Sequence, residues 1–75
     1  MTLHQAKAWI DKLSTMRDAG ILSAKEVAAV ILTRVTRLTM FGAEPKIVEF
    51  LQQQESEWLT ISEREFGEAC REMMS

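Results

Sequence analysis

Residues 27–32 are six consecutive apolar residues, Val-Ala-Ala-Val-Ile-Leu, inside a segment that carries the start and stop signals of a helix. Six helical residues turn through roughly 600°, so their side chains point in every direction around the helix axis. A helix of this kind needs neighbours on all sides. We therefore expect residues 27–32 to be enclosed, either by the rest of the chain or by a second copy of it.

The length and composition are those of one small globular domain, which we place at residues 1–75. The chain has 47% apolar and 27% charged residues, too apolar for a disordered segment. Residues 1–20 lack the apolar core of a secretory signal, and no stretch approaches the roughly 20 apolar residues that span a bilayer. The single cysteine cannot form an internal disulfide. We expect a cytoplasmic protein without a membrane segment.

Two helices are indicated in the first half of the chain. Thr2 and Gln5 have the spacing of a capping box, in which two side chains satisfy the free N–H groups of a helix start, and Ser23 and Glu26 repeat that spacing. Gly20 is suited to end the first helix, because glycine adopts the left-handed backbone conformation without steric cost. The second helix is expected to end at Phe41-Gly42.

Two further helices are predicted in the second half. Pro45 fits the first turn of a helix, where its missing N–H costs nothing. Residues 52–57 are all polar, and we interpret them as the frayed end of that helix, although continuation through them stays open. Ser62 and Glu65 have capping-box spacing again. Gly67 suggests a close helix crossing. The prediction is an all-α bundle of four short helices, near 2–18, 23–41, 45–55 and 62–74.

Apolar residues recur at helical spacing in each predicted helix. These stripes are expected to form the core; they comprise Leu3, Ala6, Trp9, Ile10, Leu13, Met16, Val27, Ala28, Val30, Ile31, Leu32, Val35, Leu38, Ile47, Val48, Phe50, Leu51, Phe66, Ala69, Cys70 and Met73. The first two helices should form an antiparallel hairpin, and the last two should cover residues 27–32. Three helices this short can hardly enclose a fourth, so we favour a homodimer through the second helix over a monomer.

Catalytic and cofactor chemistry have little support in the sequence. A metal site needs several converging ligands, whereas His4 and Cys70 stand alone at opposite ends of the chain. The three glycines are isolated, so no glycine-rich phosphate loop is present. We expect no enzyme activity, no cofactor and no metal.

Charge is unevenly distributed along the chain and suggests two alternative functions. Arg34, Arg37 and Lys46 form a candidate basic patch, which would bind nucleic acid weakly at most, and the overall pI of about 5.3 argues against that function. A glutamate face at Glu65, Glu68 and Glu72 could instead imitate nucleic acid and occupy a basic groove of another protein. Attraction between the basic middle and the acidic end, within one chain or between two, is also open.

Protein binding is the leading functional hypothesis. Methionine and aromatic side chains are frequent in adaptable binding surfaces, and the candidates here are Met40, Phe41, Phe50 and Trp58. We expect a small regulator, inhibitor or assembly factor that docks on a larger protein partner.

Overall fold

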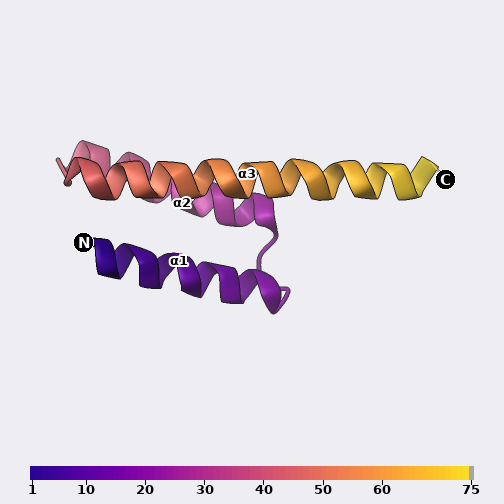
Figure 1. Ribbon diagram of the computed structural model, residues 1–75, viewed down its shortest axis with the longest axis horizontal. Coiled ribbons are helices and arrows are strands. Elements are labelled where there is room, and N and C mark those ends of the chain that lie inside the picture. Colours follow the sequence, from indigo (N-terminus) through magenta and orange to yellow (C-terminus); the bar gives the residue numbers. More distant parts are fainter. Residues whose placement is uncertain (75) are drawn as a thin grey trace.

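A computed structural model describes residues 1–74 as three helices, with no strand among them. Helix α1 spans Leu3–Asp18, α2 spans Ala24–Met40 and α3 spans Pro45–Met74. Successive helices run in opposite directions, α2 packs most closely on α3, and the end of α3 extends alone beyond the other two helices (Figure 1). The all-α prediction is confirmed. The prediction of four helices is wrong, because residues 45–55 and 62–74 belong to one continuous helix of 30 residues.

Both capping boxes predicted in the first half are present. The Thr2 hydroxyl accepts a hydrogen bond from the Gln5 N–H at 3.1 Å, and the Gln5 side chain accepts one from the Thr2 N–H at 2.8 Å. Ser23 and Glu26 exchange the same pair of bonds, each at 3.1 Å. These bonds explain why α1 and α2 begin where they do.

The turn after α1 has the left-handed conformation predicted for Gly20. Gly20 has a φ of +78°, in the left-handed region, and the Ile21 N–H donates to the Met16 carbonyl at 2.9 Å. Gly42 has a φ of +73° just after α2. Gly20 therefore lies in the turn that makes α1 and α2 the expected antiparallel hairpin, and Gly42 lies in the turn between α2 and α3 (Figure 1).

The core lies between the three helices at the end of the molecule where all of them are present. Its central side chains, Val27, Ile31 and Leu51, are fully buried. Partly buried apolar side chains surround this centre, among them Trp9 and Trp58. The rest of the buried cluster is Ala6, Ile10, Leu13, Val35 and Ile47. Most residues of the stripes predicted for the first three helices are thus confirmed as core or as packed against it. Leu3, Val30 and Leu32 are exposed, and the stripe predicted for residues 62–74 contains no buried residue, so these predictions are wrong.

Helix α3 continues through the polar run at 52–57, which we interpreted as a frayed end. Glutamine and glutamate are good helix formers, and neither proline nor glycine occurs between Pro45 and Gly67. Ser62 is consequently an interior residue of α3 rather than a helix cap, and Trp58 lies within the helix rather than in a connection. Nothing lies within 4 Å of a Cβ built on Gly67, so the predicted close crossing there is wrong.

The enclosure of residues 27–32 by the chain itself is also contradicted. Val27, Ala28 and Ile31 are buried, but Ala29 and Val30 are exposed and the side chain of Leu32 is 51% exposed. The helices before and after α2 cover only one side of it. The reason is the continuous α3: without a break near residue 57, its second half cannot fold back over α2.

Candidate protein-docking surfaces

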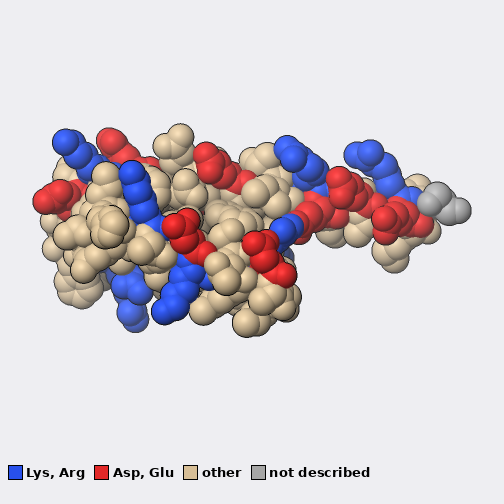
Figure 2. All heavy atoms as spheres, turned by 60° about the horizontal axis from the view of Figure 1, so that its bottom comes forward, with Lys and Arg blue, Asp and Glu red and all other residues tan. Residues whose placement is uncertain are grey.

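The second half of α3, residues 59–74, has no buried residue and is here called the distal half. Three of its apolar side chains, Leu59, Phe66 and Met73, follow one another every seven residues and are all exposed. Phe66 is 73% exposed and Met73 is 87% exposed. We call these three residues the distal stripe. Figure 2 shows the projecting end with acidic and basic side chains interleaved, the acidic ones predominating.

The distal stripe lies on the same side of α3 as half-buried Val48, which packs against the core cluster. This side is the edge of the packed surface of α3, because the centre of that surface follows Ile47, Leu51 and Trp58. Leu59 is 43% exposed, and beyond it Phe66 and Met73 are largely uncovered by the other residues within 1–74. The distal half therefore presents a core-like stripe that is open to a partner.

A second uncovered surface lies on α2, on the side away from the core. Its residues follow helical spacing and carry no charge; they are Ala29, Leu32, Thr33, Thr36 and Met40, here called the outer face of α2. The hydroxyls of Thr33 and Thr36 donate to the carbonyls of Ala29 and Leu32, each at 3.0 Å. Because these hydroxyls are satisfied within the helix, covering this face with apolar groups would leave neither of them without a partner.

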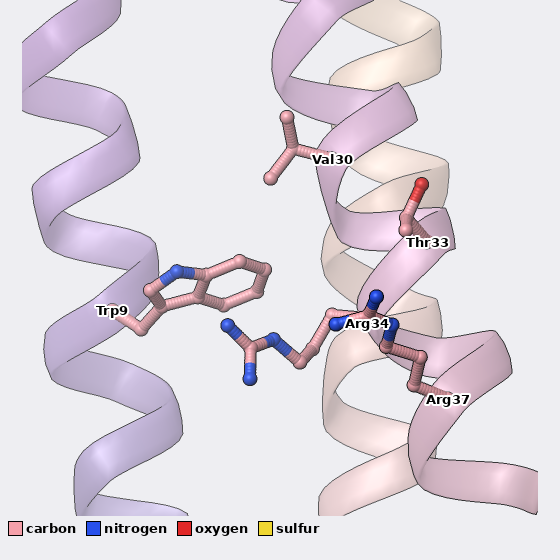
Figure 3. Close-up of a pocket in the computed structure, with 5 residues that line it drawn as sticks. All are labelled: Trp9, Val30, Thr33, Arg34 and Arg37. Carbon is pink, nitrogen blue, oxygen red and sulfur yellow. The ribbon is translucent and has the colours of Figure 1, made fainter.

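An open recess between α1 and α2 contains an aromatic ring and two cations (Figure 3). The Arg34 guanidinium lies over the Trp9 ring, 5.1 Å from its centroid, which is a cation–π distance. Arg37 lines the same recess with Val30 and Thr33. Among the described residues, no carboxylate forms an ion pair with either guanidinium.

The predicted basic patch is brought together only in part. Arg34 and Arg37 share the recess beside Trp9, whereas Lys46 lies at the start of α3 and lines a different recess, together with Lys7 and Phe50. The sequence pattern does not indicate the stacking of Arg34 on Trp9. These two residues are 25 positions apart in the sequence, and only the hairpin of α1 and α2 places them face to face.

The predicted protein-binding residues fall into two pairs. Met40 and Phe41, at the end of α2, are 77% and 84% exposed. Phe50 and Trp58 are partly buried and pack against the core cluster. The four residues therefore do not form one surface. Phe66 and Met73 of the distal stripe were expected in the core. The absence of proline and glycine between Pro45 and Gly67, which favours one long helix, is the sequence feature that could have placed them outside it.

The predicted acidic face is partly neutralised by α1. Arg17 donates a hydrogen bond to the Glu65 carboxylate, and this bond, with the charge of Glu65, raises the pKa of Arg17 above its ordinary value. The carboxylate of Asp18 lies 3.6 Å from the same guanidinium. Glu68 and Glu72 lie further along the distal half, on the same side of the helix as Glu65.

His4 and Cys70 do not approach each other: His4 lies in the first turn of α1 and Cys70 lies near the far end of α3 (Figure 1). Within residues 1–74, no group of three or more histidine, cysteine, aspartate or glutamate side chains is arranged to hold a metal ion. No helix in this range has the length and apolar character needed to cross a membrane.

No protein-family model, curated protein or solved structure matches the chain, so neither a family nor a function passes to it from a relative.

Proposed function

We propose that the protein is a small, non-enzymatic interaction module that binds a partner protein through the distal half of α3. The supporting observation is that three apolar residues at seven-residue spacing, Leu59, Phe66 and Met73, are exposed on the part of α3 that has no buried residue. Exposed apolar stripes of this kind are frequent in helices that dock against a groove or another helix.

A partner would stabilise the helix of the distal half as well as cover its apolar residues. An isolated helix of about 15 residues is marginal in water, because most helical stability in proteins comes from packing of an apolar face. Packing of Leu59, Phe66 and Met73 against a partner would supply that contribution. Binding would then add to the stability of the distal half, which is already helical in the single chain.

Affinity purification of the full chain from its native host tests this proposal. The substitution Phe66→Glu places a charge at the centre of the distal stripe, and Thr60→Glu adds the same charge at an exposed position on another side of the helix. We expect a defined protein that is recovered with the wild type and with Thr60→Glu, and at least about tenfold less with Phe66→Glu. Equal recovery with all three chains would contradict the proposal.

A second candidate function is nucleic-acid binding at the recess of Trp9, Arg34 and Arg37, supported by two guanidinium groups that no carboxylate within residues 1–74 pairs with. Fluorescence anisotropy with a labelled single-stranded oligonucleotide distinguishes it. Binding that weakens steeply with salt and is abolished by Arg34→Glu with Arg37→Glu would favour this function. The alternative of acidic mimicry through Glu65, Glu68 and Glu72 has less support, because Arg17 already neutralises Glu65.

A further inference from the structure

Two uncharged surfaces in the described part of the chain are left uncovered: the distal stripe, which is apolar, and the outer face of α2, which combines apolar residues with two threonines. They are similar in length. The stripe from Leu59 to Met73 rises about 21 Å and the face from Ala29 to Met40 about 17 Å, at 1.5 Å per residue. Each is the side of a helix that a second helix can cover. A single contact between the two surfaces would cover both.

The charges around the two surfaces are opposite. The distal half carries four glutamates and two arginines, a net charge of −2, whereas α2 carries three basic residues and one glutamate, a net charge of +2. Two distal halves, or two α2 helices, would bring like charges together. Pairing a distal half with an α2 helix joins opposite charges instead, which favours that combination over either symmetric alternative.

The shape of the molecule allows this contact to form twice between two copies. All three helices are present at one end, and α3 alone continues at the other, over a total length of 48 Å (Figure 1). Two such molecules running in opposite directions can place the single helix of each beside the helical bundle of the other. A two-fold axis then relates two identical contacts, as in most dimers of identical chains.

We infer that the chain forms a reciprocal homodimer, in which the distal stripe of each copy packs on the outer face of α2 of the other. This inference rests on the proposed function and names the partner as a second copy. It also accounts for five of the six apolar residues at 27–32: the chain itself covers Val27, Ala28 and Ile31, and the second copy covers Ala29 and Leu32. The sixth, Val30, lines the recess beside Trp9.

Mass measurement by light scattering, over a range from about 5 to 200 μM, tests the inference with full-length chains. Phe66→Glu disables the distal stripe and leaves the outer face of α2 intact, whereas Leu32→Glu does the reverse. Thr60→Glu is the control for an added charge. Circular dichroism verifies that all variants keep their helix content.

The dimer predicts complementation between the two variants. The wild type and Thr60→Glu should reach twice the 8.6 kDa mass of one chain. Phe66→Glu and Leu32→Glu alone should stay monomeric, because each substitution disrupts both of the symmetry-related interfaces and each disrupted interface should raise the dissociation constant at least about 30-fold. An equimolar mixture of the two variants should dimerise more tightly than either variant alone, because both substitutions then fall in one interface and the other interface joins an intact stripe to an intact α2 face.

Four results would overturn the inference. A wild type that is monomeric at all concentrations excludes the dimer. If Leu32→Glu still forms a dimer and Phe66→Glu does not, the dimer is formed by two distal stripes. If Phe66→Glu still forms a dimer and Leu32→Glu does not, it is formed by two α2 helices. Failure of the mixture to associate excludes a contact between unlike surfaces. If the wild type is monomeric but binds another protein through Phe66, the proposed function stands without the dimer. If it is monomeric and binds no other protein through Phe66, both the dimer and the proposed function are excluded.

Discussion

Arg17 in α1 donates a hydrogen bond to Glu65, 48 residues further along the chain, and so joins the end of the first helix to the distal half of α3. Both side chains are partly exposed, so solvent and salt screen their attraction. The bond nevertheless places the start of the distal half relative to the hairpin.

A double-mutant cycle with Arg17→Gln and Glu65→Gln should therefore show coupling. Each single substitution is expected to lower the free energy of unfolding slightly, and the double variant should be no less stable than the less stable single variant, because both substitutions remove one interaction. Urea unfolding followed by circular dichroism measures this. The coupling should decrease in about 1 M salt, and strictly additive effects at low salt would contradict the pairing.

Truncation of Ile31 should strongly destabilise the fold, because this side chain is fully buried at the centre of the three helices. Ile31→Ala is expected to cost about 2–5 kcal/mol through reduced burial and the remaining cavity, and the milder Ile31→Val about 0.5–1.5 kcal/mol. Denaturant midpoints of the two variants measure the difference. A cost below about 1 kcal/mol for Ile31→Ala would show that Ile31 is not central to the core.

Alanine substitution at Gly67 and at Gly20 should change stability in opposite directions. Gly67 is helical with open space around its Cα, so Gly67→Ala should stabilise the chain by about 0.8–1.0 kcal/mol through helix propensity. Gly20 has a positive φ, and Gly20→Ala should cost about 1–2 kcal/mol. Thermal unfolding of both variants checks the two signs. Destabilisation by Gly67→Ala would mean that a neighbour approaches the helix at this residue.

Removal of the Arg34 guanidinium should weaken the contact between α1 and α2. Arg34→Ala is expected to cost about 0.5–1 kcal/mol, the value of a partly exposed cation–π pair, whereas Arg37→Ala, in the same recess, should cost less because Arg37 does not stack on the ring. Equilibrium unfolding in urea compares the two variants. Equal effects would contradict a specific role for the stacking of Arg34 on Trp9.

The helix starts and the core could be predicted because their causes are local. The capping boxes at Thr2 and Ser23 and the left-handed turn at Gly20 each depend on residues within a few positions, and helical spacing identified Val27, Ile31 and Leu51 as core. Ser62 and Glu65 have the same spacing as a capping box but lie inside a helix, where Glu65 accepts the bond from Arg17 instead. The local pattern cannot show which hydrogen-bond partner a side chain has in the folded chain.

The surfaces proposed for docking depend on relations that local patterns do not contain. Phe66 and Met73 have the spacing of core residues, and only the continuity of α3 takes them beyond the bundle. The apolar run at 27–32 indicates enclosure correctly for Val27 and Ile31, but the bundle has one helix fewer than predicted to cover Leu32. The predicted binding set of Met40, Phe41, Phe50 and Trp58 is divided because Phe50 and Trp58 pack against the core cluster, whereas Met40 and Phe41 are exposed at the end of α2.

The distance between the two ends of α3 tests most directly whether its second half projects from the bundle. Spin labels can be attached at Lys46→Cys and Arg71→Cys, in a chain with Cys70→Ser, and diluted with unlabelled chain so that only distances within one molecule are observed by electron–electron double resonance. A continuous helix separates these residues by about 38 Å along its axis. A distribution centred near that value is the predicted result. A distance below about 20 Å, as for a helix folded back on itself in a four-helix bundle, would contradict the account.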